Sequence, residues 1–207
     1  MSVINNHIKT NFENEIGTGA GHAPKYPCYF YYDFGFFAQI YSDTELGIGA
    51  PVWIKGVRFE MYEAGAQESV NNQTLKLGQV NQVEFKSNVR NDMTQSPFVD
   101  FSTSNITTVK SSFTWTIPPT TVAFWKEIIF DTPFRYDPTI ANSHLLLVWE
   151  NRDGSYTTGS TSPWSVVSSN STYRSYYDYQ DNSMPPTTDY GTRDSTGRPN
   201  AQFIFEV

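Results

Sequence analysis

The sequence is poor in the residues that most often carry cross-links or catalysis. Its 207 residues include one cysteine, Cys28, and three histidines, His7, His22 and His144. A single thiol cannot form a disulfide within the chain, and we expect Cys28 to be a small buried apolar side chain. The histidines form no HExxH motif and no pair four residues apart, so the sequence has no zinc signature.

Long apolar runs and an excess of positive charge are also lacking. No run of about 18 apolar residues occurs, so no transmembrane helix and no membrane partner are predicted. The first 15 residues lack the basic and apolar regions of a signal peptide, and we expect the protein to assemble in a cytoplasm. Lys and Arg number 14 against 21 Asp and Glu, a net charge of −7. Nucleic acid is not an expected partner, because its phosphates require a basic surface.

The dominant pattern in the sequence is an alternation of apolar and polar residues with a period of two. In segment 51–63, PVWIKGVRFEMYE, apolar residues occupy every second position from Val57 onward, as in a half-buried strand. The apolar residues before Lys55-Gly56 have the opposite parity. A β-bulge is therefore predicted at Lys55-Gly56.

Further segments have the length and composition of strands, and no window shows a helical stripe. LLLVWE (145–150) is apolar on both faces and is predicted to be a central strand. Many short strands separated by turns predict an all-β fold, an antiparallel β-sandwich of the jelly-roll type. We place it at residues 16–207, after an N-terminal arm of residues 1–15. The other predicted strands are YPCYFYYDF (26–34), QTLKLGQV (73–80), SSFTWTI (111–117), EIIF (127–130) and AQFIFE (201–206).

Segment 127–150, EIIFDTPFRYDPTIANSHLLLVWE, contains two apolar runs around residues rich in Asp, Pro and Asn. We interpret the middle as a corner between two strands. Pro133 is predicted to end the first strand, and Asp131 and Asp137 are predicted to form turns instead of acting in catalysis.

Catalytic motifs are not evident elsewhere either. The glycine-rich segment GTGAGHAPKYP (17–27) lacks the GK[ST] of a phosphate-binding loop, and no GxSxG occurs. We therefore predict no enzyme and name no catalytic residue. Asp and Asn oxygens in NRDG (151–154) and YDYQDNS (177–183) suit a hard cation, so structural calcium is the single cofactor candidate and metal binding stays open.

The order of several segments resembles jelly-roll modules, some of them carbohydrate-binding-like, of secreted and surface proteins of Bacteroidetes and of virion proteins of their phages. This resemblance implies a non-catalytic protein used for binding or display. The matching segments span most of the chain: IGTG (16–19), QIYSDTELG (39–47), WIKGVRFEMY (53–62), NQTLKLG (72–78), WKEIIFDTPFRYDP (125–138), LLLVWE (145–150), YRSYYDY (173–179) and GRPNAQFIFEV (197–207).

Aromatic residues lie among Ser, Thr, Asn and Asp late in the chain. Sugar rings pack their C–H faces on aromatic planes, and such a mixture also suits a protein interface or a ring-rich core. All three interpretations remain open. The predicted glycan- or partner-binding residues are Trp149, Tyr156, Trp164, Tyr173, Tyr176, Tyr177 and Tyr179, with Tyr190 nearby.

Together these features predict a non-enzymatic bacteriophage virion structural protein: a capsid decoration, fibre-base or tail-appendage subunit. Its expected partners are other virion proteins, further copies of itself and host-surface polysaccharide. The alternative is a carbohydrate-binding or adhesin module of a bacterial surface protein.

Overall fold

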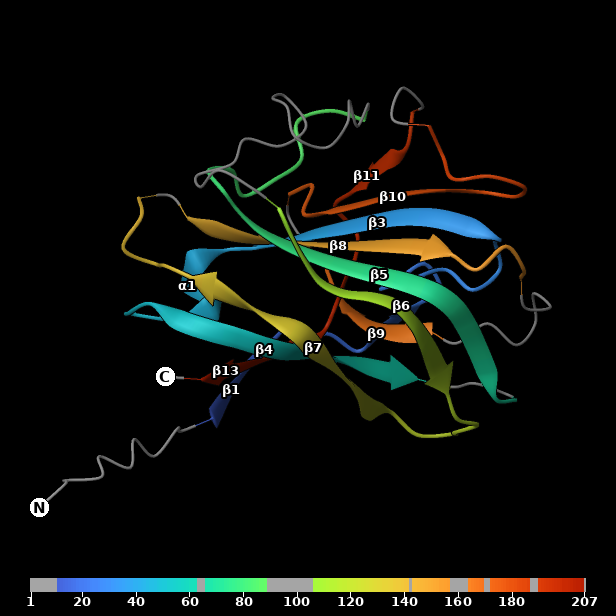
Figure 1. Cartoon of the computed structure of the whole chain (residues 1–207), viewed down its shortest axis with the longest axis horizontal. Coiled ribbons are helices and arrows are strands. Elements are labelled where there is room, and N and C mark those ends of the chain that lie inside the picture. The colour runs from blue at the N-terminus through green and yellow to red at the C-terminus, as the bar shows by residue number, and fades with distance from the viewer. Residues whose placement is uncertain are drawn as a thin grey trace, which may run out of the picture.

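The computed structural model describes residues 11–62, 66–88, 106–141, 143–156, 164–169, 172–186 and 190–206. In this part of the chain, two antiparallel sheets pack against each other (Figure 1). The prediction of an all-β sandwich is thereby confirmed.

The first sheet is built around β4 (Val52–Tyr62), which pairs with β7 (Phe124–Tyr136) and with β13 (Ala201–Glu206). Its remaining strands are β1 (Asn11–Ile16), β2 (Gly21–Ala23), β9 (Trp164–Ser168) and β12 (Arg198–Pro199). Strand β1 pairs along its whole length with β13, so residues 11–15 belong to the sandwich and not to an arm. The rest of the predicted arm lies outside the described residues.

The second sheet has the strand order β11-β10-β3-β8-β5-β6. Its central strand β8 (His144–Arg152) contains LLLVWE and lies between β3 (Phe34–Tyr41) and β5 (Glu68–Val80), as predicted from its two apolar faces. The outer strands are β6 (Thr107–Ile117), β10 (Ser175–Gln180) and β11 (Thr192–Asp194).

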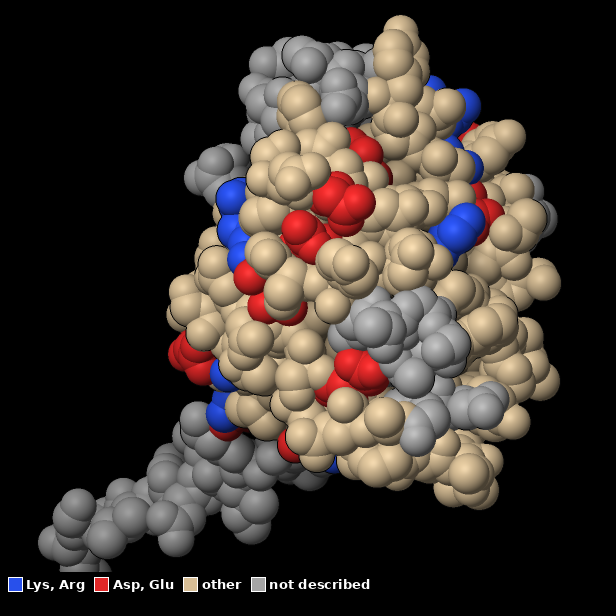
Figure 2. Space-filling model, turned by 90° about the vertical axis from the view of Figure 1, so that its right-hand side faces the viewer, with Lys and Arg blue, Asp and Glu red and all other residues tan. Residues whose placement is uncertain are grey.

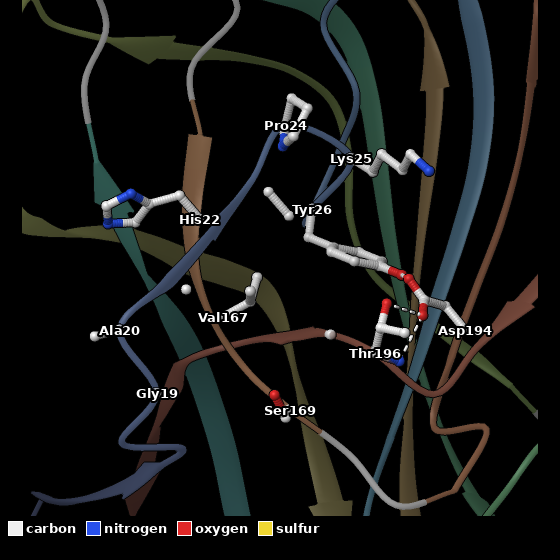
Figure 3. A pocket seen from close by; sticks show the side chains of 13 residues that line it. Gly19, Ala20, His22, Pro24, Lys25, Tyr26, Val167, Ser169, Asp194 and Thr196 are labelled. Carbon is white, nitrogen blue, oxygen red and sulfur yellow. Dashed lines mark hydrogen bonds between the residues drawn. The ribbon is translucent and has the colours of Figure 1, made fainter.

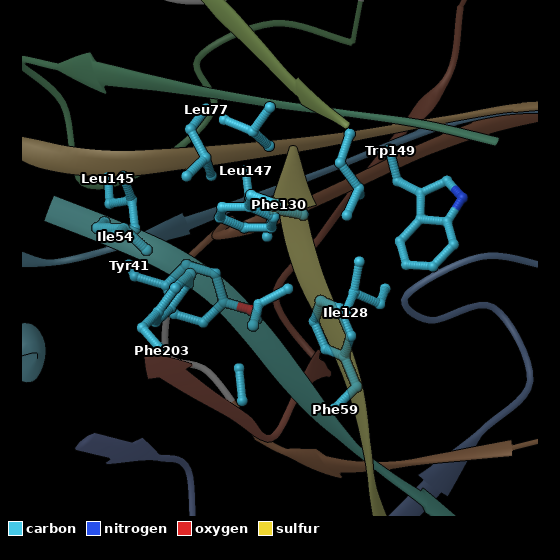
Figure 4. Packing of buried hydrophobic residues seen from close by; sticks show 14 of the residues in the cluster. Tyr41, Ile54, Phe59, Leu77, Ile128, Phe130, Leu145, Leu147, Trp149 and Phe203 are labelled. Atoms are coloured by element: carbon cyan, nitrogen blue, oxygen red, sulfur yellow. The ribbon is translucent and has the colours of Figure 1, made fainter. Parts of the chain in front are cut away.

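The main core fills the space between the sheets. Figure 4 shows Tyr41, Phe59, Ile128, Trp149 and Phe203 converging there from β3, β4, β7, β8 and β13. A second, smaller cluster on the outer face of the six-stranded sheet explains why both faces of β8 are buried. It comprises Phe36, Ala38, Ile40, Val80, Phe85, Leu146, Val148 and Tyr176.

The predicted bulge in β4 is confirmed. The pairing of β4 with β7 shifts between Ile54 and Gly56, and the β13 register shifts opposite the same place. A Cβ on Gly56 would approach the Ile128 carbonyl oxygen to 2.8 Å, so the close approach of backbones at the bulge requires glycine.

Two expectations about the corner at 127–150 are wrong. Pro133 does not end the strand: it lies inside β7, the outermost strand of its sheet on that side, where a missing N–H is tolerated. Asp131 is also part of β7 and pairs with Lys110 at 2.8 Å. Asp137 does form the turn, because its carboxylate accepts hydrogen bonds from the backbone N and hydroxyl of Thr139.

The sandwich also contains one short helix in its described part, α1 (Asp43–Leu46), which is too short to produce a helical stripe in the sequence. Ser42 and Glu45 form a reciprocal capping box, whose S-x-x-E spacing is visible in SDTE (42–45). Glu45 also receives hydrogen bonds from Arg198, at 2.7 Å, and from Arg174, at 2.7 Å. These contacts fix α1 to β12 and to the segment before β10. With four residues, α1 is far too short to cross a membrane.

Candidate functional site

Six tyrosines meet on one side of the sandwich, and we call them the tyrosine cluster. Two of them, Tyr177 and Tyr179, extend from the face of β10 that packs on the main core. Tyr156 follows β8 in the chain. The other three come from the turns between β2 and β3, so residues far apart in sequence combine into one surface: Tyr29, Tyr31, Tyr32, Tyr156, Tyr177 and Tyr179.

The rings form a continuous series of contacts. The Tyr32 and Tyr179 centroids lie 4.2 Å apart, and Tyr179 stacks nearly parallel to Tyr177 at 5.6 Å. Tyr31 joins Tyr32 at 5.3 Å and Tyr156 at 6.1 Å. Such mutual packing fixes the planes of the rings before any ligand arrives.

The tyrosine cluster extends from the core to the solvent, so its members differ in how far they are exposed. Tyr156 is 61% exposed and Tyr31 is 41% exposed, whereas the other members are partly buried. Burial raises the pKa of Tyr29 and of Tyr179 above the ordinary value, so both hydroxyls stay protonated at neutral pH. The surface therefore offers apolar ring faces together with hydroxyl groups that donate and accept hydrogen bonds.

A buried series of hydrogen bonds holds the backbone that carries these tyrosines. Trp149 Nε1 donates to Gln73 Oε1 at 2.6 Å, and Gln73 Nε2 donates to Asn151 Oδ1 at 2.6 Å. Asn151 Nδ2 then donates to the carbonyl oxygen of Tyr32 at 3.0 Å. The core thus positions Tyr32 through buried side chains that are not part of the tyrosine cluster.

The predicted aromatic residues separate into three groups. Tyr156, Tyr177 and Tyr179 come together in the tyrosine cluster. Trp149 and Tyr176 are fully buried, Trp149 in the main core and Tyr176 in the outer cluster, so no surface ligand can stack on them. The remaining residues lie elsewhere on the surface: Trp164, Tyr173 and Tyr190 are 43%, 41% and 82% exposed, and Tyr173 packs against Arg193.

A pocket of about 400 Å³ adjoins the tyrosine cluster. Its wall is formed largely by residues 19–26, within the glycine-rich segment in which no phosphate-binding loop was predicted. In Figure 3, His22 lies on one side and Asp194 on the other, with the Tyr26 ring and Val167 between them. Lys25 links pocket and cluster, because it lines the pocket while its Nζ donates to the Tyr177 hydroxyl at 2.9 Å.

The polar groups of the pocket are ordered by their neighbours. The His22 ring stacks on Tyr62, with centroids 3.9 Å apart. Asp194 accepts hydrogen bonds from the Tyr26 hydroxyl at 2.6 Å and from Thr196 N at 2.6 Å. Burial opposes ionisation of Asp194, but the bonds from Thr196 and Tyr26 prevail and lower the pKa of its carboxyl.

The two segments considered for calcium meet at Asp33, beside Tyr32. Gly154 N donates to the Asp33 carbonyl oxygen at 3.0 Å, and Asn182 N lies 3.5 Å from its Oδ2. Across the described ranges, however, no group of three or more His, Cys, Asp or Glu side chains is arranged to hold a metal ion. Metal binding stays a prediction.

Charge is dispersed over the face shown in Figure 2. Acidic and basic side chains occur in small groups among uncharged residues, without a broad basic area among the residues coloured there. Among the described residues of the whole molecule, several charges are paired. Arg58, for example, contacts Glu13 at 2.5 Å and Glu127 at 2.6 Å.

Sequence reasoning missed Tyr29, Tyr31 and Tyr32 because YPCYFYYDF was interpreted as a buried strand. The structure has turns at residues 24–33, and β3 begins at Phe34. Cys28 and Phe30 point into the core, as expected for Cys28, while the tyrosines lie partly or largely exposed. Pro27 and the doubled tyrosines were the available signals, since a proline inside a run argues against a central strand.

No protein-family model and no curated protein matches this chain.

Proposed function

We propose that this chain is a non-enzymatic structural protein of a bacteriophage virion, a jelly-roll subunit that contacts host-surface glycan through its tyrosine cluster. The single observation that carries the recognition role is the convergence of six tyrosines from three separate segments on one partly exposed surface. The virion setting rests on the resemblance of the segment order and on the antiparallel sandwich.

A glycan suits this surface better than a catalytic substrate does. Ring faces at fixed angles match the C–H faces of successive sugars, and tyrosine hydroxyls match sugar hydroxyls. The rings are also held in place by mutual contacts and by the bond from Asn151 to Tyr32, so little ordering is needed on binding.

The alternative, a carbohydrate-binding or adhesin module of a bacterial surface protein, predicts the same ligand on the same surface. Gene context separates the two settings. Neighbouring genes for portal, capsid or tail proteins support the virion protein, whereas neighbouring genes for glycan uptake or surface export favour the alternative.

A glycan array followed by calorimetry tests the recognition role. We expect binding to a polysaccharide, weakened at least about tenfold by Tyr179→Ala or Tyr32→Ala because each removes a central ring of the series. Tyr190→Ala is the matched control: it removes an 82% exposed tyrosine elsewhere on the surface and should leave affinity unchanged. An array without a hit at millimolar glycan contradicts the proposal.

A further inference from the structure

We infer that the pocket beside the tyrosine cluster receives an acidic sugar, a uronic acid unit, at the end of the glycan that lies on the tyrosines. This inference rests on the proposed glycan-binding role and names the chemical class of one subsite. It depends on the size of the pocket, its continuity with the cluster and the Lys25 N–H donors that no described residue accepts.

The pocket and the cluster form one continuous surface. Lys25 and Tyr26 line the pocket, and each also touches Tyr177: the Lys25 Nζ lies 4.5 Å from the Tyr177 ring centroid, and the Tyr26 and Tyr177 rings meet edge to face. A chain of sugars stacked along Tyr179 and Tyr177 would therefore lead to the pocket. Its volume of about 400 Å³ is within the range of small-ligand sites.

The two charged side chains of the pocket wall, Asp194 and Lys25, differ in how many of their hydrogen-bonding positions already have a partner among the described residues. The Asp194 carboxylate is used within the protein, because Oδ1 accepts from Thr196 N and Oγ1 and Oδ2 accepts from the Tyr26 hydroxyl. The Lys25 ammonium has three N–H donors, and among the described residues one of them is used, by the Tyr177 hydroxyl. Burial disfavours the charge on Lys25, yet the bond to Tyr177 and the nearby Asp194 raise its pKa.

A singly charged anion fits this arrangement. One ammonium with two donors that no described residue uses can bind one carboxylate. The described part of the pocket wall includes no second Lys or Arg, which a doubly charged phosphate would need. The rest of the wall suits a sugar ring: Pro24, Val167 and the Tyr26 ring supply apolar area, while Ser169 and His22 supply polar groups. A uronic acid combines these features in one unit.

Titration of the intact protein with matched probes tests the inference. The probes are a glucose tetrasaccharide and the same tetrasaccharide ending in glucuronic acid, with free glucose and free glucuronic acid as single units. We expect the acidic probes to bind about tenfold more tightly at low salt, a preference that shrinks as salt rises. Lys25→Met should remove this preference, so that the acidic and neutral tetrasaccharides bind with equal affinity.

Two further variants complete the design. Ser169→Trp fills the pocket from an exposed position directly after β9 and should abolish binding of free glucuronic acid, with the tetrasaccharide still held by the tyrosines. Lys86→Met is the charge control, since it removes an exposed ammonium that pairs with Glu84 away from the pocket lining. Thermal melting confirms that each variant is folded before titration.

The outcomes separate this inference from the proposed function. A preference for acidic probes that Lys25→Met removes and Lys86→Met retains supports both. Tyr179-dependent binding with equal affinity for acidic and neutral probes, or a preference that survives Lys25→Met, overturns the acidic subsite and leaves the glycan-binding role in place. Failure of every probe and of the glycan array overturns both.

Discussion

The indole Nε1 of Trp149 donates to the side-chain oxygen of Gln73 at 2.6 Å, in the fully buried space between the sheets. The same oxygen lies 3.6 Å from Cys28 Sγ. Through Gln73 and Asn151 the core is connected to the backbone of Tyr32. We therefore expect stability and the proposed ligand binding to be coupled through these buried residues.

Gln73→Leu tests how much this buried series contributes to stability. The change leaves the Trp149 N–H without its acceptor in a region closed to water and removes one of the bonds to Asn151. We expect a loss of about 2 kcal/mol in the free energy of unfolding. Urea denaturation measures the loss. Gln180→Leu, which removes a surface amide bonded to Ser183, should cost less than about 0.5 kcal/mol. Equal effects of both variants would contradict a structural role for the buried series.

The lowered pKa of Glu45 predicts that the folded protein loses stability at low pH. Burial opposes its ionisation, but the hydrogen bond and charge of Arg198 and the bonds from Ser42 lower its pKa from 4.5 to about 2. Because the folded-state pKa is depressed, the stabilisation is fully present above pH 4.5 and is lost as pH falls toward 2. Because Glu45 is partly exposed and solvent screens its pairing, we expect it to contribute about 1–2 kcal/mol to this decline.

Unfolding measured between pH 5 and 2 checks the contribution of Glu45. Glu45→Gln should be less stable at pH 7, since Arg198 then lacks its counter-ion, and should show a shallower decline in acid. Glu127→Gln removes a carboxylate from an exposed pair with Arg58 and should keep the wild-type slope. A Glu45→Gln curve parallel to the wild type would refute the assignment.

The two glycines Gly56 and Gly49 should respond oppositely to alanine. A Cβ at Gly56 meets the Ile128 carbonyl oxygen at 2.8 Å and Ile204 Cδ1 at 3.1 Å, so Gly56→Ala should cost about 2 kcal/mol. At Gly49 no atom lies within 4 Å of the added group, and Gly49→Ala should be neutral or slightly stabilising. Melting temperatures compare the two, and a tolerated Gly56→Ala would mean that the bulge does not require glycine.

Cys28 should be inert in the folded protein. Its thiol is fully buried, and burial raises its pKa well above the ordinary value, so little thiolate forms and none is accessible. We expect modification by a thiol reagent to be about a thousandfold or more slower than for free cysteine, because it requires opening of the fold. Reaction at the rate of an exposed thiol would place Cys28 outside the core.

Period-two alternation predicted most strands, the central position of LLLVWE and the bulge at Lys55-Gly56, because these follow from which face of a strand is buried. The residues of the candidate site could not be predicted as well from the alternation. Tyr176 and Tyr177 are sequence neighbours on opposite faces of β10, and both faces of that sheet are covered by apolar clusters. Parity alone therefore could not tell which tyrosine reaches the surface.

The tyrosines that the turns at 24–33 contribute to the tyrosine cluster are placed there by tertiary packing. Cys28 and Phe30 enter the core while Tyr29, Tyr31 and Tyr32 turn toward Tyr179. No local pattern specifies that these turns lie beside β10, which follows more than 140 residues later. The pocket arises in the same way, from residues 19–26 meeting residues 194–197 across the molecule.

Nuclear magnetic resonance of ring-labelled tyrosines, recorded while the glycan selected by the array is added, tests the central claim most directly. We predict that signals of Tyr32, Tyr177 and Tyr179 shift in proportion to occupancy, whereas those of the buried Tyr41 and Tyr136 stay fixed. Saturable binding that leaves the signals of the tyrosine cluster unmoved would contradict it.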